Sequence, residues 1–263
     1  MTDTSTRTSD PAVRLLEQWE QQQTGYLPRR EERFAVIVDA LGSLLGDHFT
    51  VLDVGCGPGS LARRVLDAHP GATVLALDSD PLLLEIGRRA LTGYGDRLRW
   101  VDADLRDADW PAAVGQASVD AAVSTTALHW LTPGALLEFH AEIATVIRPG
   151  GVFLNGDNIP FDTNQPACRL LAQQVWDADL EESFGRLGIV DWDRWWEQAE
   201  ATPELTDVVA ERRRRVAARS SRGSDRPASF AVHTVGLAEA GFVDIGTLWQ
   251  RYDDRVLLAR RPA

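Results

Sequence analysis

Short apolar runs alternate with amphipathic segments along most of the chain. The run at residues 50–54 is short, apolar except for Asp53, and closed by glycines, which is typical of a strand buried on both faces. The segments between such runs repeat apolar residues at helical spacing for about ten residues. This rhythm predicts strands at 50–54, 73–78, 97–104, 118–125 and 151–158, and later at 241–250 and 255–261.

The helices predicted by the same pattern fill the intervals between these strands. Residues 11–46 carry two apolar stripes, which are separated where Pro28 breaks the helical pattern. Further helices are predicted at 59–70, 81–91, 136–147 and 232–240. Strands that alternate with helices indicate βαβ units. The predicted fold class is therefore α/β, a doubly wound and mostly parallel seven-stranded sheet with a terminal antiparallel hairpin and a helical cap insertion.

The alternation stops at residue 160 and returns after residue 228, which predicts the domain organisation. Residues 47–159 and 229–263 form the core, and residues 1–46 are N-terminal helices that cover its ligand site. Residues 160–228 look helical and hold four of the nine tryptophans. We interpret them as a cap or lid that shapes the acceptor pocket, with residues 219–227 as its mobile return. The alternative is that these tryptophans only pack the insertion onto the sheet.

The composition limits the classes of binding partner that we expect. A net charge of −12 opposes binding to nucleic acid. The chain has no apolar run long enough to cross a membrane and no secretory signal at its start, so we expect a cytoplasmic protein. One basic stretch, Arg212–Arg215 with Arg219, Arg222 and Arg226, stands out. Its simplest interpretation is a solvated helix face, and the alternative is contact with an anionic substrate or partner.

Several kinds of chemistry are excluded or disfavoured. All 27 basic residues are arginine, which excludes a lysine Schiff base and a Walker lysine. No G-x-S-x-G elbow of an α/β hydrolase occurs. The five histidines make no ligand-spaced cluster, and Cys56 and Cys168 are expected to be free thiols, so we predict no metal. Ser124-Thr125-Thr126 replaces the N-P-P-Y-like stretch of many DNA- and protein-methylating enzymes.

The richest segment is the glycine-rich turn after the first predicted strand. Glycines allow the backbone to approach a ligand closely, and nucleotides bind at this edge of an open α/β sheet. The spacing Gly55, Gly57, Gly59 differs from the G-x-G-x-x-G of dinucleotide loops. Asp53 precedes the turn and would repel pyrophosphate, but it suits an ammonium or sulfonium group. Asp53 could equally brace the loop by accepting backbone N–H groups, and both roles are compatible.

Two further carboxylates end neighbouring predicted strands. Asp78 ends the second strand, where a carboxylate suits the two hydroxyls of a ribose. Asp104 ends the third strand, where a carboxylate can accept a hydrogen bond from an adenine amino group. Together with the glycine-rich turn, these residues predict a site for an adenosine-containing ligand of positive charge.

This constellation resembles the class I S-adenosylmethionine-dependent methyltransferases over residues 30–158 and the last strands. The resemblance implies S-adenosylmethionine as cofactor and S-adenosylhomocysteine as product. It assigns the glycine loop to the amino-acid end, Asp78 to ribose and Asp104 to adenine. The N-terminal segment often covers the cofactor in this family. The cofactor-binding residues that we expect are Asp53, Gly55, Cys56, Gly57, Gly59, Asp78, Ser79, Asp104, Leu105, Ser124, Thr125, Tyr26 and Arg30.

The stretch Ala127-Leu128-His129-Trp130 looks like the trans-aconitate methyltransferase-like branch of that family, which implies O-methylation of a small molecule at a carboxylate or hydroxyl. His129 follows the fourth strand and is our candidate catalytic base; the alternative is an orienting role without proton transfer. A carboxylate acceptor needs no base. The candidate substrate-binding residues are Trp130, Asp157, Asn158, Trp176 and Trp196.

We therefore predict S-adenosylmethionine-dependent methyl transfer to a small molecule. The arginine-only, tryptophan-rich composition favours natural-product metabolism. Three alternatives remain open. The acceptor could be a peptide or protein, or the fold could hold the cofactor as a sensor or a non-methylating catalyst. An NAD(P)-dependent oxidoreductase is disfavoured by the glycine spacing and by Asp53.

Overall fold

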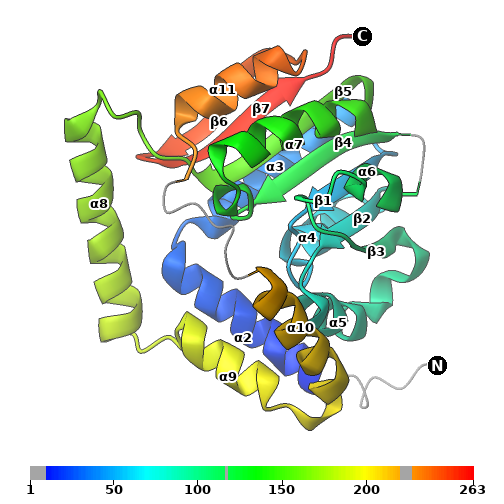
Figure 1. Cartoon of the computed structure of the whole chain (residues 1–263), viewed down its shortest axis with the longest axis vertical. Coiled ribbons are helices and arrows are strands. Elements are labelled where there is room, and N and C mark those ends of the chain that lie inside the picture. The colour runs from blue at the N-terminus through cyan, green and yellow to red at the C-terminus, as the bar shows by residue number, and fades with distance from the viewer. Residues whose placement is uncertain (1–9, 116–117, 220–226) are drawn as a thin grey trace.

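The computed structural model describes residues 10–115, 118–219 and 227–263, which form a seven-stranded sheet with helices on both faces (Figure 1). The strand order is β3-β2-β1-β4-β5-β7-β6, and β7 runs antiparallel to both of its neighbours. The predicted doubly wound α/β fold with a terminal antiparallel hairpin is confirmed. The strands are β1 (Thr50–Val54), β2 (Thr73–Asp78), β3 (Leu98–Asp102), β4 (Val119–Thr125), β5 (Ile147–Asn158), β6 (Val243–Arg251) and β7 (Asp254–Arg260).

Local signals in the sequence explain where the helices of the core begin. The side chain of Asp80 accepts hydrogen bonds from the backbone of Leu82 and Leu83, and Pro81 occupies the first position of α5. Thr132 and Pro133 start α7 in the same way. The core helices are α3 (Arg30–Leu45), α4 (Ser60–Ala68), α5 (Pro81–Ala90), α6 (Trp110–Ala113), α7 (Pro133–Val146) and α11 (Phe230–Glu239), with short turns η1 (Thr92–Arg97) and η2 (Leu128–Trp130).

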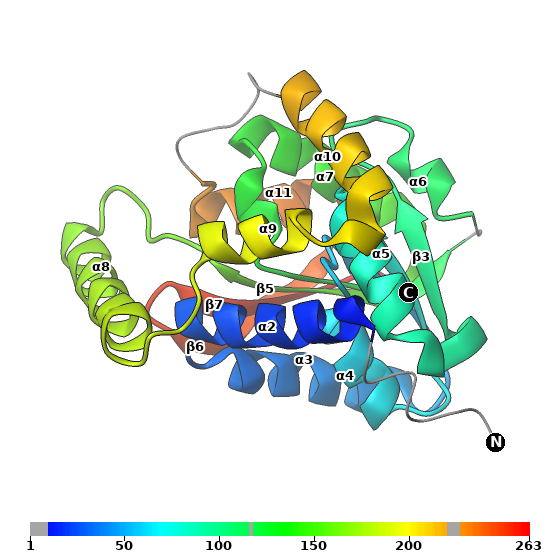
Figure 2. The ribbon, with the colours of Figure 1, turned by 90° about the horizontal axis from the view of Figure 1, so that it is seen from below.

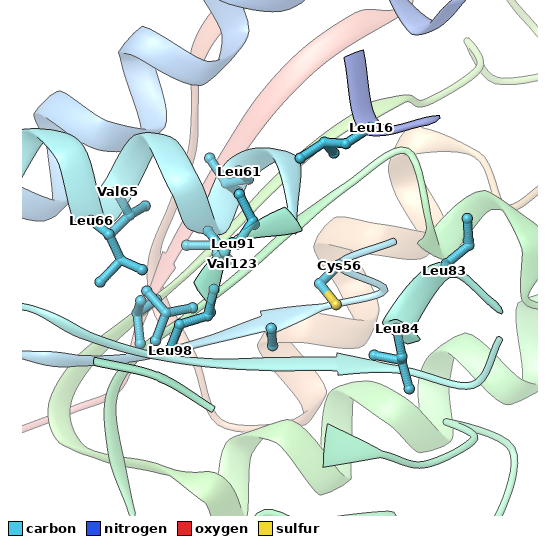
Figure 3. Packing of buried hydrophobic residues seen from close by; sticks show 14 of the residues in the cluster. Leu16, Cys56, Leu61, Val65, Leu66, Leu83, Leu84, Leu91, Leu98 and Val123 are labelled. Atoms are coloured by element: carbon cyan, nitrogen blue, oxygen red, sulfur yellow. The ribbon is translucent and has the colours of Figure 1, made fainter. Parts of the chain in front are cut away.

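Alternate residues of the buried strands supply two hydrophobic clusters, one on each face of the sheet. Val51 of β1 joins the cluster formed with α3, α4 and α5, whereas its neighbour Leu52 joins the one formed with α6, α7 and α11. Figure 2 shows α3 and α4 on one side of the sheet, with α7 and α11 on the other. Figure 3 shows part of the first cluster around Cys56, which lies at the end of β1. The core thus holds the carboxyl end of β1 rigidly.

The start of β5 differs from the prediction. The sequence predicts a helix that ends at Ile147 and a strand that begins at Gly151, but β5 already begins at Ile147. Ile147 pairs with Val119 and Val152 pairs with Ala121, so β5 carries a bulge between Ile147 and Val152. Pro149 cannot donate a ladder hydrogen bond and Gly150 has a φ of 73°, which suits a bulge but hides the strand from its sequence pattern.

The insertion and the first helix together frame the end of the sheet where the parallel strands finish. In both views α8 stands at the left edge of the molecule, and α2 and α9 lie between it and α10, which lies near α5 (Figures 1 and 2). The residues 220–226, which hold Arg222, Arg226 and most of the expected mobile return, lie outside the described residues. These elements are α2 (Pro11–Tyr26), α8 (Pro166–Leu180), the π-helical turn η3 (Glu181–Arg186), α9 (Trp192–Glu200), η4 (Pro203–Leu205) and α10 (Thr206–Arg219).

Two buried histidines between α7 and α11 make the fold sensitive to acid. Burial lowers the pKa of His140 to about 3 and that of His233 to about 4, from an ordinary value of 6.5. Below pH ~6.5 these two histidines are therefore protonated in the unfolded chain but stay neutral in the folded one. Stability consequently falls as the pH drops.

We expect His140→Leu to raise the free energy of unfolding at pH 5 by about 2 kcal/mol relative to its effect at pH 8. The measurement is urea denaturation at both pH values, with the exposed His48 changed to Leu as the control. An equal effect of His140→Leu at both pH values would contradict the prediction.

Candidate active site

The glycine-rich loop between β1 and α4 is held tightly from two sides. An ideal Cβ on Gly55, whose φ is 67°, would lie 2.3 Å from the Cβ of Ala127, so only glycine fits there. An ideal Cβ on Gly57 would lie 3.5 Å from the indole of Trp19 on α2. The backbone N–H of Cys56 donates to Leu77 of β2. The loop therefore lies between the segment that follows β4 and the first helix.

Two carboxylates, the buried Asp53 and the half-buried Asp78, support this loop. Asp53 accepts a hydrogen bond from the backbone of Ala62 at 3.1 Å, which is the bracing contact that we weighed for it. Asp78 accepts from the backbone of Gly57 and of Asp80, both at 2.8 Å. The two carboxylates thus set the position of the loop and of the first turns of α4 and α5.

The electrostatics of these carboxylates indicate the charge of the ligand. Burial raises the pKa of Asp53 to about 7, and the nearby charge of Asp78 adds to the rise. Burial likewise raises the pKa of Asp78 to about 6, against the hydrogen bonds that it accepts. Neither carboxylate forms an ion pair with an arginine in the described part of the chain. A ligand that brings positive charge and hydroxyl donors would stabilise the ionised form of both carboxylates, which fits S-adenosylmethionine.

The expected adenine side lies where β2 and β3 end. Leu105 and Ser79 are half-buried there. Both oxygens of Asp104 accept hydrogen bonds from the guanidinium of Arg106, at 2.8 and 2.6 Å. An adenine amino group would therefore have to share Asp104 with Arg106, a partner that the sequence prediction did not include.

The end of β4 contains a strained residue and a buried serine whose hydroxyl already has a partner. Thr126 has a φ of 51°, which is costly for a β-branched residue, and its backbone N–H donates to Gly156 of β5. Ser124 is fully buried and its hydroxyl donates to the carbonyl of Val54 at 2.9 Å. Its side chain therefore joins β4 to β1, and contact of Ser124 with the cofactor stays a prediction, whereas Thr125 is half-buried at the end of the strand.

His129 and Asp157 form a dyad across the ends of β4 and β5. The Nδ1 atom of His129 lies 2.7 Å from Oδ1 of Asp157, and the backbone N–H of His129 donates to Oδ2 at 3.1 Å. Burial lowers the pKa of His129, but the charge and hydrogen bond of Asp157 outweigh it, so the net pKa is raised. Asp157 is only 1% exposed, and its pKa is lowered by His129 against the effect of burial.

This pairing adds a candidate role to the one expected for Asp157. The carboxylate is engaged by the imidazole and by the backbone of Asn158, an arrangement that can orient His129, and contact of Asp157 with a substrate stays a prediction. Because Asp157 binds Nδ1, Nε2 is the ring nitrogen left for an acceptor. Ala127, two residues before His129, contacts Gly55, so the dyad adjoins the glycine-rich loop.

One buried residue beside the dyad was missed by the sequence reasoning. Arg33 of α3 is fully buried, donates to the carbonyl of Gly156 at 3.2 Å and pairs with Asp254. It also lies 3.5 Å from Oδ1 of Asn158, so Asn158 is partly engaged as well. The sequence gives no signal for the contact between Arg33 and Asp254, because the two residues lie on a helix and a hairpin that are far apart along the chain.

The N-terminal residues expected at the cofactor have other partners. The hydroxyl of Tyr26 accepts a hydrogen bond from the backbone of Trp192 at 3.2 Å, so it faces the insertion. Arg30 is buried and donates to Glu20 at 2.6 Å. Burial opposes ionisation of Glu20, but the charges of Arg30 and Arg64 hold its pKa at about 2. Contact of Tyr26 and Arg30 with the cofactor carboxylate stays a prediction, and both side chains would have to share their present partners, Trp192 and Glu20, with the cofactor.

The tryptophans expected to line the pocket occupy three different settings. Trp130 is 70% exposed, so most of its ring faces solvent. Trp176 of α8 lines a small hollow of about 20 Å³ that Asn158 also lines. Trp196 of α9 packs edge-on against Trp195 and lies under the guanidinium of Arg212, 3.6 Å from the ring centroid. A cavity of about 510 Å³ lies elsewhere, between α2, α4 and residues 187–190.

Two searches complete the description of the site. Among the residues that the structure describes, there is no group of three or more His, Cys, Asp or Glu side chains that could hold a metal ion. Across the same residues, no helix combines the length and the apolar character needed to cross a membrane.

Comparison with known proteins shows which class part of the chain resembles. A model of the methyltransferase domain matches residues 51–151, a range that begins in β1 and contains the glycine-rich loop, Asp78 and His129. The resemblance to class I S-adenosylmethionine-dependent methyltransferases is confirmed, and S-adenosylmethionine is the cofactor of that class.

Particular relatives agree with this class. Trans-aconitate 2-methyltransferase of Azoarcus sp. (strain BH72) is 33% identical over 156 residues, which are 59% of this chain and 56% of the relative. The chain spans about half the length of the curated relatives that it matches.

Solved structures share the fold at lower identity. The apo form of the S-adenosylmethionine-dependent methyltransferase SibL aligns with a TM-score of 0.53 and 22% identity over 88% of this chain and 55% of that one. Human N-acetylserotonin methyltransferase in complex with S-adenosylmethionine aligns with a TM-score of 0.51 and 15% identity over 97% of this chain and 61% of that one.

Proposed function

We propose that the protein transfers a methyl group from S-adenosylmethionine to an oxygen of a small molecule. The observation that carries this proposal is the placement of the His129–Asp157 dyad beside a glycine-rich loop that rests on two carboxylates, the buried Asp53 and the half-buried Asp78. The first feature can orient an acceptor or take its proton, and the second suits a cationic cofactor.

The residues that would hold the cofactor follow from the contacts of the loop. The backbone of Gly55 to Gly59 would take its amino-acid end, next to the buried Asp53. Asp78 would accept from the ribose hydroxyls, and Asp104 with Leu105 would border the adenine. Bound there, S-adenosylmethionine would supply an electrophilic methyl group on a positively charged sulfur.

The dyad would serve one of two acceptors. For a hydroxyl acceptor, Nε2 of His129 would take the proton while Asp157 holds the ring and balances its charge. For a carboxylate acceptor no proton is lost, and a protonated His129 would orient the negative charge instead. The relative named trans-aconitate 2-methyltransferase supports a carboxylate, and the composition of the chain supports a place in natural-product metabolism.

The proposal is tested by cofactor binding followed by methyl transfer. Calorimetry with S-adenosylhomocysteine measures the first, and a screen of small hydroxy and carboxy acids with methyl-labelled cofactor measures the second. Binding together with label transfer supports the proposal. Binding without transfer to any acceptor would favour a sensor, and no binding at all would overturn the cofactor assignment.

Asp78 gives the sharpest variant for the binding step. We expect Asp78→Ala to bind S-adenosylhomocysteine roughly 10- to 150-fold more weakly, because two ribose hydroxyls and the Gly57 N–H lose a charged acceptor. Asp39, an exposed carboxylate on α3, changed to Ala is the matched control and should bind normally. Unchanged affinity in Asp78→Ala would show that the ribose lies elsewhere.

A further inference from the structure

Four consecutive arginines on α10 have unlike surroundings. Arg213 and Arg214 are 65% and 69% exposed, and they pair with Glu200 and with Glu211 of their own helix, respectively. Arg212 and Arg215 are instead partly buried and reach the end of the sheet. The interpretation of this stretch as a solvated helix face is therefore right for two residues and wrong for the other two.

Arg215 joins α10 to the ends of β2 and β3. Its guanidinium makes a bidentate pair with Asp102, with N–O distances of 2.6 and 2.9 Å. The same group donates to the carbonyl of Ser79 at 3.2 Å. Glu211, one turn earlier, holds the Nε atom at 2.8 Å. Such a planar, bidentate arrangement fixes both position and orientation. Ser79 follows Asp78, and Asp102 precedes Asp104 by two residues, so Arg215 bridges the two strand ends that flank the expected adenosine site.

Arg212 connects α10 to the glycine-rich loop through a chain of hydrogen bonds. Its Nε donates to Asp80 at 2.8 Å, and Asp80 donates its backbone N–H to Asp78 at 2.8 Å. Asp78 in turn accepts from the backbone of Gly57 at 2.8 Å. Asp80 also caps α5. Arg212 thus brings a positive charge to Asp80, whose backbone N–H bonds to Asp78.

The other side of Arg212 rests on the tryptophan cluster. Its guanidinium lies over the ring of Trp196, which packs against Trp19 with ring centroids 6.5 Å apart. Trp19 contacts the position of Gly57. Arg212 is therefore connected to the glycine-rich loop in two ways, through hydrogen bonds on one side and through packed aromatic rings on the other.

We propose that Arg212 and Arg215 are positioning residues that hold α10 over the adenosine half of the cofactor site and fix Asp78 and Ser79 for binding. The inference rests on the proposed function, since it concerns the same cofactor. Neither arginine need touch the ligand: each acts through groups that do. The insertion then contributes to cofactor retention as well as to the acceptor pocket.

The test compares matched arginine variants. We expect the double variant Arg212→Ala/Arg215→Ala to bind S-adenosylhomocysteine roughly 5- to 30-fold more weakly, chiefly because the ligand dissociates faster. Arg214→Ala, whose partner is on its own helix, is the control and should match wild type. The probe 5′-methylthioadenosine, which lacks the amino-acid end, should lose affinity by the same factor, because the arginines act on the adenosine half.

Two further measurements separate positioning from general stability. In a double-mutant cycle, Arg215→Ala should have little effect once Asp102→Asn has removed its partner. The affinity of wild type should fall with added salt more steeply than that of the double variant, since the pairs are ionic. If the double alanine variant does not fold, Arg212→Gln with Arg215→Gln replaces it and keeps the bulk of both side chains.

The outcomes are distinct. The proposal is supported if the double variant binds both probes more weakly than wild type does, while Arg214→Ala binds them with wild-type affinity. Equal affinity of wild type and the folded double variant overturns it and leaves the proposed function intact. A loss in thermal stability without a change in affinity also overturns it. A wild type that binds neither probe overturns the proposed function and this inference together.

Discussion

Replacing Asp53 by asparagine is expected to make the ligand-free protein more stable at pH 8 and to weaken cofactor binding. Asp53 is buried and its pKa is raised to about 7, from 3.8. Ionising it in the folded protein is therefore costly, and the cost is present above pH ~7. The folded state holds a proton that the unfolded state releases between these two values, so stability falls as the pH rises from ~4 to ~7.

The size of the effect follows from the shift. A shift from 3.8 to about 7 corresponds to on the order of 4 kcal/mol at pH 8. Asparagine keeps an oxygen for the N–H of Ala62 but adds an amide that needs its own partner. We therefore expect a net gain of about 1–3 kcal/mol in the free energy of unfolding at pH 8 and little gain at pH 4.

Binding should change in the opposite direction. Because asparagine cannot neutralise a cationic ligand, S-adenosylmethionine should bind roughly 10- to 150-fold more weakly to Asp53→Asn. Urea denaturation and calorimetry measure the two effects, and the exposed Asp39 changed to Asn is the control. Equal stability at pH 8, or unaltered affinity, would show that Asp53 is not an ionised carboxylate kept for a cation.

The regular part of the fold could be predicted because local signals agree with the global pattern. The predicted bounds of β1 match the observed ones, since a short run that is apolar except for Asp53 ends at the glycines of the loop. α5 began where Asp80 and Pro81 indicated. The start of β5 could not be predicted, because a bulge places Pro149 and Gly150 within a paired strand and these residues usually mark a turn.

The candidate site was predictable in its residue types and less so in its contacts. Asp53, Asp78 and the glycines follow strands, so topology alone brings them together. The partner of His129 is Asp157, which lies 28 residues further along and ends a different strand. Sequence reasoning placed both at one edge but could not show that they bind each other, because such pairing depends on rotamers and on the depth of each strand end.

Long side chains from helices were the hardest to place. Tyr26 and Arg30 were assigned to the cofactor by position, but each has a protein partner that the sequence did not predict. Arg212 and Arg215 were assigned to solvent because they lie in a charged run, yet helical spacing turns them toward Asp80 and Asp102. An arginine reaches several ångströms from its backbone, so its partner is decided by packing of whole helices and not by local pattern.

Changing His129 to alanine is expected to lower turnover by roughly 10²- to 10⁴-fold with a hydroxyl acceptor, while affinity for S-adenosylhomocysteine is kept. The reason is that the variant loses the group that would take the proton, whereas the carboxylates under the loop are untouched. With a carboxylate acceptor the loss should be small and mostly in KM, since no proton is transferred. The exposed His48 changed to Ala is the control.

Asp157→Asn separates a base from a merely structural histidine through its pH profile. In wild type the charge of Asp157 raises the pKa of His129, so the neutral base forms only at higher pH. Without that charge the pKa of His129 falls, and the acidic limb of kcat/KM should move to lower pH, with a reduced plateau because the ring is less well oriented. In His129→Ala the same limb should vanish. Initial rates between pH 5 and pH 9 measure both effects, and an acidic limb that stays in place in the two variants would assign the titrating group to the acceptor and remove His129 from proton transfer.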